Sequence, residues 1–590
     1  MLNGQSKSSQ YPRPQFERAD WVNLNGAWNF EFDDQNLGEQ EDWFEKKSFS
    51  RQIAVPFVYE CSASGIGDTE HHENVWYEKN VVIPQSKNGR RVLLNFQGVD
   101  YSAKVWVNGR FAGEHKGANT AFHFDITGCV AFGSVNRIVV KAEDSKSCCQ
   151  PRGKQRWVGH SFACWYIQST GIWKTVWMEF VEETHISSVK ITPDVERQSV
   201  AFEYSFSGLG GRENLSHKTG IFFDDRKVRE FDFAVSQDSM NYISDLSDDS
   251  FVQKVQLWTP EEPNLYRVRF TLMCGEKVLD EVDSYFGMRQ IAIQDGKAFL
   301  NGRELYQKLV LEQGYWPETM LTPPSDEAVC KEIDCILKMG FNGIRLHQKI
   351  EDDRFLYFCD RKGLLVWSEM AATYVFSDQA VDNFTREWLE IVRQQYNHPC
   401  IITWTPFNES WGIPGVLLDK KQQAFTEAIY YLTKAMDPMR PVITNDGWEH
   451  TISDIVTIHD YEGDAAALSA RYADKEKFTQ EGAMSGNGRR LMADGFAYRG
   501  QPIVISEFGG MAMPGRTDQD DGWGYGKDAK NEEKFLKRYA GLLRVIKAQG
   551  SVVGFCYTQL TDVQQEQNGL YTQGRVSKVD PAKIREANRL

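Results

Sequence analysis

The sequence has no run of 18 apolar residues anywhere in its 590 residues, so it predicts no membrane-spanning helix. Its first ten residues (MLNGQSKSSQ) contain no apolar stretch of the kind that a secretory signal requires. Basic residues are in the minority: the chain has 67 Lys and Arg against 82 Asp and Glu, which gives a net charge of −15. Nucleic acids and anionic membranes attract basic surfaces, so this charge argues against both as partners.

Paired cysteine motifs are also missing. Eleven cysteines occur without a CxxC pair, and no group of Cys and His has the spacing of a structural zinc site. An odd number of cysteines without a pairing pattern indicates reduced thiols, so we expect a cytoplasmic protein. We also expect no cofactor, and the sequence leaves homo-oligomerisation open.

The composition that remains is typical of a folded chain, with 41% hydrophobic and 25% charged residues. At about 150 residues per domain, the length predicts three or four domains. Aromatic residues make up 13% of the chain. Aromatic rings stack on the apolar faces of sugars but also fill cores, so composition alone does not separate these two uses.

The first 182 residues predict a jelly-roll β-sandwich. Residues 103–107 (AKVWV) alternate in polarity and meet Asn108-Gly109, the strongest short sequence signal for a hairpin. Residues 91–96 (RVLLNF) and 137–141 (RIVVK) are further expected strands, and residues 170–177 predict another turn and strand. Short strands with frequent turns fit this class of sandwich.

Residues 183–286 predict a second β-sandwich, of the immunoglobulin-like kind. Two prolines, Pro260 and Pro263, impose an extended, turn-rich connection before the last strands. About 100 residues of short strands is the size of such a domain. The expected strands are residues 187–191, 200–206, 218–223 and 266–274.

Residues 287–590 predict a (β/α)₈ TIM barrel, because strand-like runs now alternate with helical patterns. Residues 325–339 have helical apolar spacing with Ser325 at the start. A doubly wound sheet would be expected to carry a glycine-rich loop after its first strand, and none occurs here. The other expected helices are 352–362, 384–396 and 424–436, and the eight expected strands are 305–311, 341–346, 364–367, 401–404, 441–444, 454–458, 502–505 and 552–557.

Two glutamates follow barrel strands at positions where active sites lie. Glu409 comes after the fourth expected strand and Glu507 after the seventh. The carboxyl ends of barrel strands meet on one face, so these carboxylates are expected to face each other, as glycoside hydrolysis requires. Exposed glutamates are common, and each one alone is more simply explained as a surface residue.

Other expected strand ends carry polar groups as well. A single His near a barrel rim is more often structural, and Arg345 equally fits a salt bridge to a helix. Polar or charged groups at six strand ends are harder to explain as stabilising residues. They are Arg345 and His347, Glu369, Asn445 and Asp446, and His459, Asp460 and Tyr461, besides the two glutamates.

At these residues the sequence resembles glycoside hydrolase family 2, which includes β-galactosidases, β-glucuronidases and β-mannosidases. The resemblance covers nearly the whole chain and implies the three domains described above. The motifs that carry it are, in chain order, WVNLNGAWNF (21–30), VWY (75–77), VWVNG (105–109), LWTPEEPNLY (257–266), FLNG (299–302), NE (408–409) and SEFG (506–509).

The resemblance implies a retaining double displacement with Glu507 as nucleophile and Glu409 as acid and base. Asn408 would hold the 2-hydroxyl of the sugar, and Tyr461 would hydrogen-bond the nucleophile. Arg345 and Tyr461 are expected to keep Glu507 ionised, whereas nearby negative charge is expected to keep Glu409 protonated. The remaining expected substrate-binding residues are His347, Glu312, Trp316 and Trp523.

The departures from the family pattern concern metal and sugar choice. Large β-galactosidases place a metal-binding His two residues beyond the Glu that Glu369 resembles, and Ala371 stands there, so we expect no metal. β-Glucuronidases grip the sugar carboxylate with an Asn-x-Lys motif after strand eight. The corresponding stretch is Glu566-Gln567-Asn568, whose acidic residue would repel a glucuronate and favours a neutral sugar, above all galactose.

The sequence therefore predicts a retaining exo-β-glycosidase that acts on terminal non-reducing β-linked sugars, with β-galactosides as the first candidates. The same mechanism on another glycone, a β-glucuronide or an arabinoside, is the nearest alternative. A carbohydrate-binding protein with an inactive barrel is the alternative from a different class. Two facing carboxylates argue against it, because binding alone does not require them.

Overall fold

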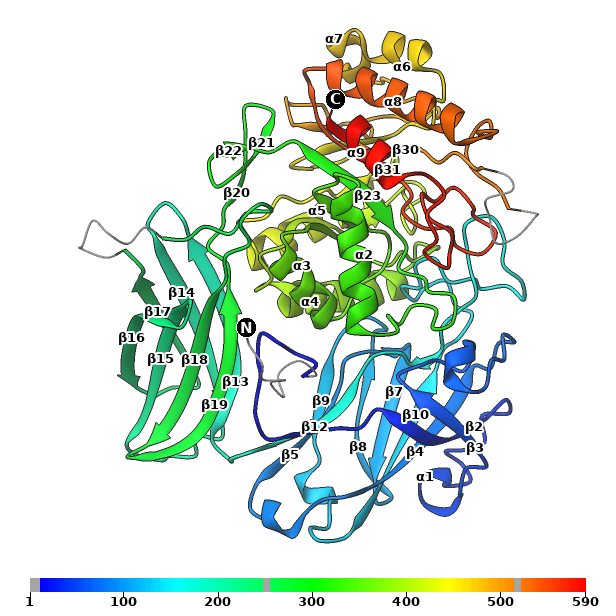
Figure 1. Cartoon of the computed structure of the whole chain (residues 1–590). Helices are drawn as coiled ribbons and strands as arrows, with labels where there is room; N and C mark the ends of the chain where they lie inside the picture. Colours follow the sequence, from blue (N-terminus) through cyan, green and yellow to red (C-terminus); the bar gives the residue numbers. More distant parts are fainter. Residues whose placement is uncertain (1–10, 248–254, 514–521, 590) are drawn as a thin grey trace.

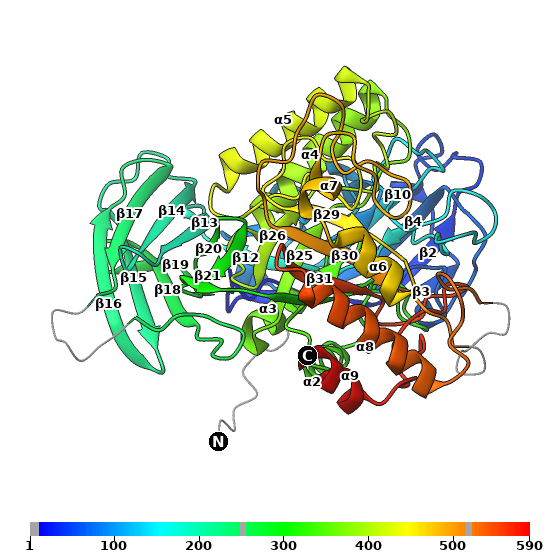
Figure 2. The same cartoon turned by 90° about the horizontal axis from the view of Figure 1, so that it is seen from above.

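The computed structural model describes the chain except for residues 1–10, 248–254, 514–521 and 590. Figure 1 shows a β-sandwich in blue and cyan, a second β-sandwich in teal and green, and a barrel that runs from green to red. The view from above in Figure 2 shows the two sandwiches flanking the barrel. Each part has its own large hydrophobic core.

The first sandwich joins a four-stranded sheet, ordered β1-β12-β5-β9, to a six-stranded sheet, ordered β3-β2-β4-β10-β7-β8. The hairpin predicted at Asn108-Gly109 connects β7 to β8, and both residues have positive φ, 51° and 77°. The elements are β1 (Trp21–Asn23), β2 (Gly26–Phe32), α1 (Trp43–Lys46), β3 (Arg51–Val55), β4 (Asn74–Val82), β5 (Arg91–Phe96), β6 (Val99–Asp100), β7 (Ser102–Val107), β8 (Arg110–Lys116), β9 (Phe122–Asp125), β10 (Val135–Glu143), β11 (Gly171–Ile172) and β12 (Val176–Val181).

The second sandwich packs a three-stranded sheet, ordered β13-β14-β17, on a four-stranded sheet, ordered β16-β15-β18-β19. Strands β16, β17 and β19 were not predicted; β16 and β17 expose most of their residues and lack a strong apolar pattern. The strands are β13 (His185–Asp194), β14 (Ser199–Ser207), β15 (Leu215–Phe223), β16 (Arg226–Ala234), β17 (Ser239–Asp245), β18 (Tyr266–Cys274) and β19 (Lys277–Phe286). A small sheet of β20 (Ile291–Gln294), β21 (Lys297–Leu300) and β22 (Arg303–Glu304) leads to the barrel.

The barrel is built on a parallel sheet of seven strands, ordered β26-β25-β24-β23-β31-β30-β29. Its gap is filled by the short parallel pair of β27 and β28, since β27 continues from β26 and β28 contacts β29. The strands are β23 (Gln307–Glu312), β24 (Gly343–Leu346), β25 (Leu365–Glu369), β26 (Ile401–Thr405), β27 (Phe407–Asn408), β28 (Asn445–Asp446), β29 (Val456–His459), β30 (Ile503–Gly509) and β31 (Val552–Thr558). The fifth predicted strand, residues 441–444, forms a single parallel bridge to β26, between Val442 and Trp404, and a longer pairing begins only at β28 after it.

The helices of the barrel begin at side-chain caps. Ser325 accepts a hydrogen bond from the backbone of Ala328, as the sequence pattern predicts for the first helix, and Asp352 does the same for Phe355. The helices are α2 (Asp326–Lys338), α3 (Asp353–Lys362), α4 (Asp378–Gln395), α5 (Lys420–Met436), α6 (Ala465–Tyr472), α7 (Lys475–Thr479), α8 (Glu532–Ala548) and α9 (Pro581–Arg589). Helices α6 to α9 were not predicted.

Two expectations about the whole chain can be compared with the structure. Within the described residues, no helix has both the length and the apolar character needed to cross a bilayer. All eleven cysteines are free thiols.

Candidate functional site

Glu409 stands directly after β27 in a backbone conformation that few residues adopt. Its φ is 51°, and that of Ser410 is 57°, both in the left-handed region that normally favours glycine. Hydrogen bonds to the neighbouring strand hold this turn, because Glu409 N donates to Asp446 O at 3.0 Å and Ser410 N donates to Asn445 Oδ1 at 2.9 Å. The strained turn thereby fixes the direction of the Glu409 side chain.

Glu507 lies within β30, on the opposite side of the same barrel end. One oxygen of Glu409 and one of Glu507 are within 4.8 Å of each other. Glu507 Oε1 binds Arg345 Nη1 at 2.7 Å, and Glu507 Oε2 accepts a short hydrogen bond from the Tyr461 hydroxyl. The Tyr461 ring is stacked on Tyr525, with ring centroids 3.6 Å apart.

Arg345 on β24 connects the side chains of several strands. It is completely buried, and its Nε donates to Glu369 Oε2 at 2.7 Å. Its Nη2 donates to Asn408 Oδ1 at 2.7 Å and lies 2.9 Å from Asp446 Oδ2. A buried guanidinium that binds several carboxylates neutralises part of their negative charge and fixes their positions. Because Asn408 accepts from Arg345, its amide nitrogen is left without a partner among the described residues.

His459, at the end of β29, lies between the two glutamates. Its Nδ1 is 2.8 Å from Glu409 Oε1 and 3.4 Å from Glu507 Oε2, and its Nε2 is 2.8 Å from Asp446 Oδ2. Carboxylates only accept hydrogen bonds, so a ring with both nitrogens beside them carries two protons. Burial opposes that charge, but Glu507 and Asp446 raise the pKa of His459 to about 10.

This cation changes the expectation for Glu409. Burial raises the pKa of Glu409, but its hydrogen bond to His459 and the charge of that residue lower it to below the ordinary value. Burial likewise raises the pKa of Glu507, and the charges of His459 and Arg345 outweigh burial. The expectation that negative charge keeps Glu409 protonated is wrong for this state of the protein, in which both carboxylates are ionised.

His347 and Glu369 complete the buried cluster. His347 Nδ1 is 2.9 Å from Glu369 Oε1, and burial together with the charges of Lys154 and Arg345 lowers the pKa of His347 well below its usual value. Burial raises the pKa of Glu369 to about 7.

Three predicted residues do not contact the two glutamates directly, and of these Trp523 reaches the cluster through an edge contact with Tyr525, which stacks on Tyr461. Glu312, at the end of β23, is buried, and burial and the charge of Glu332 raise its pKa to about 8. Trp316 makes a cation–π contact with Arg575, whose guanidinium lies 3.7 Å from the centre of its ring. Trp523 donates its Nε1 to Ala163 O at 3.1 Å. Within the described residues, no hydrogen bond or ring contact joins these three side chains to Glu409 or Glu507.

Sequence reasoning missed one contribution, from the first sandwich. Lys154 and Trp165 come from its loops, and the Lys154 ammonium lies 5.9 Å from the centre of the Trp165 ring. Trp165 in turn makes an edge contact with Trp411, two residues beyond Glu409. No motif marks Lys154 in the sequence, since its place beside the barrel depends on how two domains pack.

The arrangement combines two ionised carboxylates, one doubly protonated histidine and an orphaned amide donor. Glu409, His459 and Glu507 also have the spacing of a cation site. His459 donates protons to both glutamates in this state, however, and a metal ligand would need a free nitrogen lone pair. One oxygen of Glu409 and one of Glu507 lie within 4.8 Å, which is less than the roughly 6.5–9.5 Å between the carboxyl groups of inverting glycosidases.

The geometry agrees with the family to which the sequence can be assigned. Profiles described as "Glycosyl hydrolases family 2, sugar binding domain", "Glycosyl hydrolases family 2" and "Glycosyl hydrolases family 2, TIM barrel domain" match residues 21–150, 184–289 and 291–574. The matches follow one another along nearly the whole chain. The chain belongs to glycosyl hydrolases family 2.

Curated relatives carry two different names within this family. A β-galactosidase of Thermoanaerobacter pseudethanolicus is 28% identical over 406 residues, which are 66% of this chain and 51% of that protein. A β-glucuronidase of Bacteroides fragilis is 26% identical over 466 residues, which are 75% of this chain and 63% of that protein. The aligned part of the chain thus spans between half and two thirds of these two relatives.

Solved structures support the fold. A β-glucuronidase from Ruminococcus gnavus in complex with D-glucuronic acid superposes with a TM-score of 0.78 at 17% identity, covering 97% of this chain and 99% of that one. An uncultured Clostridium sp. β-glucuronidase gives a TM-score of 0.77 at 19% identity, covering 98% and 99%. At this identity the similarity establishes the architecture.

Proposed function

We propose that the protein is a retaining exo-β-glycosidase in which Glu507 is the nucleophile and Glu409 the acid and base. The observation that carries the proposal is the approach of the two carboxylates to within 4.8 Å, with Glu507 held by Arg345 and Tyr461. A carboxylate that is ionised and positioned by two hydrogen-bond donors can attack an anomeric carbon as a nucleophile. The orphaned Asn408 amide is a donor for a sugar hydroxyl.

Labelling with a 2-deoxy-2-fluoro β-glycoside tests the proposal. The fluorine slows breakdown of the covalent intermediate, so the sugar should accumulate on Glu507 and appear as a mass increase on its peptide. Product analysis by NMR should show the β-anomer first. A label on Glu409, or an α-anomer as first product, would contradict the assignment.

The glycone that we propose first is a neutral sugar, β-galactoside before the others. The support is Glu566, which is buried and accepts a short hydrogen bond from the Tyr166 hydroxyl and one from Asn568 Nδ2 at 3.1 Å. Burial and the charge of Glu507 raise the pKa of Glu566, so the site already disfavours negative charge and a second carboxylate nearby would be disfavoured as well. A panel of nitrophenyl glycosides should show faster cleavage of the β-galactoside than of the β-glucuronide.

A β-glucuronide is the second candidate, and one observation favours it. Lys154 is a buried ammonium that forms no ion pair with a described residue, so a sugar carboxylate could neutralise it. Several relatives and structural neighbours are also named β-glucuronidases. A clear preference for the glucuronide in the same panel would establish this candidate, and no turnover of any glycoside would favour an inactive carbohydrate-binding protein.

A further inference from the structure

Two loops of the first sandwich are hydrogen-bonded to the barrel beside the candidate site. In the first, Arg152 N and Gly153 N both donate to Ala372 O, at 3.0 and 3.2 Å, just beyond the end of β25. Gly153 is required there, since its φ is +57° and an added Cβ would lie 2.5 Å from the carbonyl oxygen of Gln348. This loop therefore holds Lys154 in a defined place at the domain boundary.

The second loop is hydrogen-bonded to the segment after β31. Gln565 Nε2 donates to Ala163 O at 2.9 Å and to Trp165 O at 3.0 Å, and the Tyr166 hydroxyl donates to Glu566. The two loops are also joined to each other, because Tyr166 N donates to Lys154 O at 2.8 Å. Lys154 and Glu566 thus belong to one hydrogen-bonded assembly that spans both domains.

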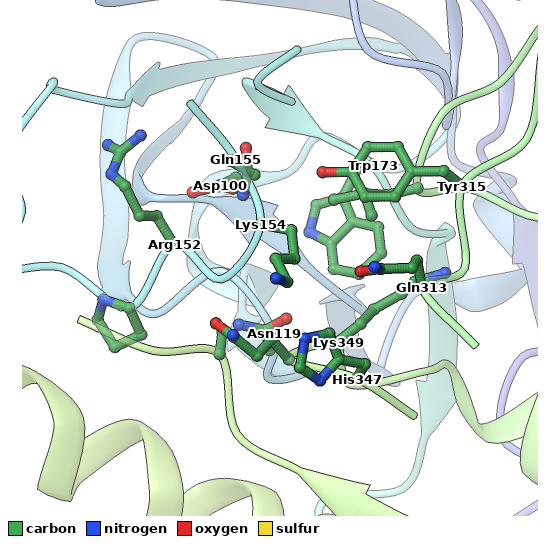
Figure 3. A pocket seen from close by; sticks show the side chains of 14 residues that line it. Asp100, Asn119, Arg152, Lys154, Gln155, Trp173, Gln313, Tyr315, His347 and Lys349 are labelled. Carbon is green, nitrogen blue, oxygen red and sulfur yellow. Dashed lines mark hydrogen bonds between the residues drawn. The ribbon is translucent and has the colours of Figure 1, made fainter. Parts of the chain in front are cut away.

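Lys154 is 8% exposed and has no carboxylate within ion-pairing distance among the described residues. Its hydrogen-bonding neighbour is the thiol of Cys164, a weak acceptor. Lys154 lines a small cavity of about 20 Å³. Figure 3 shows its side chain among those of Gln313, His347 and other polar residues. Burial lowers the pKa of Lys154, but the nearby Cys164, Glu566 and Glu409 raise it above the usual value, so the ammonium keeps its charge. Because no carboxylate forms an ion pair with it among the described residues, its donors are open to a ligand.

Other polar atoms near this place also lack partners. Gln313 Nε2 donates to the Tyr166 hydroxyl at 3.2 Å and to Gln559 Oε1 at 2.9 Å, yet Gln313 Oε1 and Gln559 Nε2 have no partner within the described part of the chain. Asn568 Oδ1 is likewise unpartnered. Buried polar atoms in folded proteins are rarely left unsatisfied, so several orphans together suit a ligand with several hydroxyls.

We propose that Lys154, supplied by the first sandwich, is a glycone-binding residue that acts with Glu566 to hold a hydroxyl group of an uncharged sugar. A hydroxyl placed between them can donate to the Glu566 carboxylate and accept from the Lys154 ammonium, which satisfies both charged groups at once. The inference rests on the proposed glycosidase function and specifies its glycone site. The barrel alone would lack this donor.

The charges around Lys154 explain the choice of an uncharged sugar. Burial raises the pKa of both Glu566 and Glu409, and the Lys154 ammonium opposes that effect at each, so its charge already acts on two carboxylates. A uronate would add a third anionic group beside an ammonium whose charge already acts on two carboxylates. A neutral hydroxyl adds none.

The experiment replaces Lys154 by Met, an unbranched side chain one atom shorter that lacks the charge. We expect the KM for a nitrophenyl β-galactoside to rise by about 10- to 100-fold, as the loss of a hydrogen bond to a charged group predicts, with a smaller change in kcat. Glu566→Gln should raise the KM as well, and the double variant should lose less than the sum of both. Lys146→Met, an exposed lysine of the same region, is the matched control and should behave like the wild-type protein.

A stability measurement separates binding from a structural role. Removing an ammonium that forms no ion pair with a described residue should change Tm little, so a large fall in Tm with an equal loss of kcat would make Lys154 structural and overturn the proposal. If the Met variant does not fold, Lys154→Gln replaces it. An unchanged KM would also overturn the proposal, and a selective loss of β-glucuronide cleavage would make Lys154 a carboxylate-binding residue instead.

Failure of the proposed function would be visible separately. A Glu507→Gln variant cannot complete turnover, but it should still bind D-galactose, which calorimetry can measure without catalysis. Lys154→Met in that background should weaken binding by a similar factor. Binding that depends on Lys154 would support the inference even if the wild-type protein cleaved no glycoside, and binding that ignores Lys154 would refute it.

Discussion

The imidazole of His459 lies 2.8 Å from the carboxylate of Glu409, and its opposite nitrogen lies 2.8 Å from Asp446. One proton in the first of these hydrogen bonds decides whether Glu409 is an acid or a base. With the proton on His459, Glu409 is a carboxylate, as required for activating water. With the proton on Glu409, it can protonate a leaving group.

Substitution of His459 should change the pH profile of the proposed activity. His459→Asn removes a positive charge that lowers the pKa of both Glu409 and Glu507. The acidic limb of the kcat/KM profile should therefore move to higher pH, because it reports the ionisation of Glu507, whose pKa rises when the cation beside it is lost. His72→Asn, in the first sandwich, should leave the profile in place. A variant that lost activity equally at every pH would show that His459 acts only on structure.

The same residue should make folding stability depend on pH. Its pKa is raised in the folded protein, from 6.5 to about 10, so the folded state binds the proton more tightly than the unfolded chain. This contribution is complete below about pH 6.5 and is lost as the pH rises through 10. Calorimetry at pH 6.5 and pH 10.5 should give a larger fall in Tm for wild type than for His459→Asn. Equal falls would contradict the assigned charge.

The two glutamates should differ in their response to substitution. Glu507→Ala removes the route to a covalent intermediate, so kcat should fall by several orders of magnitude on every substrate. Glu409→Ala should depend on the leaving group, because an activated phenol needs little protonation. Azide should restore turnover of this variant and yield a β-glycosyl azide, detected by NMR. An α-azide from Glu409→Ala would reverse the roles.

The barrel could be predicted from sequence because its strands are buried on both sides and form continuous apolar runs, as in residues 365–367 and 503–505. Glu409 and Glu507 follow such strands, so topology alone brings them to one face. The conformation of Glu409 and the central place of His459 depend on side-chain directions that no periodicity encodes. The place of Lys154 near the site could not be predicted from sequence. More than 400 residues separate it from Glu566, and the two residues belong to one assembly only after the two domains have packed.

Chelation should leave the activity almost unchanged. Ala371 offers no ligand at the position where large β-galactosidases bind metal, and His459 is doubly protonated between Glu409 and Glu507. We expect activity with excess EDTA to stay within about twofold, far from the several kcal/mol that a Lewis acid contributes. Loss of most activity, restored by magnesium, would show that the cluster binds the ion in its working state.

Gly153 gives a test of the domain boundary in which no side chain of the candidate site is replaced. Gly153→Ala places a methyl group 2.5 Å from a backbone oxygen of the barrel and forces a left-handed φ of +57° on alanine. The loop must shift, and we expect a loss of about 1–3 kcal/mol in the free energy of unfolding, measured with denaturant. Because the shift moves Lys154, the KM for the galactoside should rise as well. Gly159→Ala is the matched control, since its added Cβ meets nothing within 4 Å. If both variants behaved like the wild-type protein, the loop would not be fastened to the barrel as described, and Lys154 would have no fixed place from which to bind a sugar.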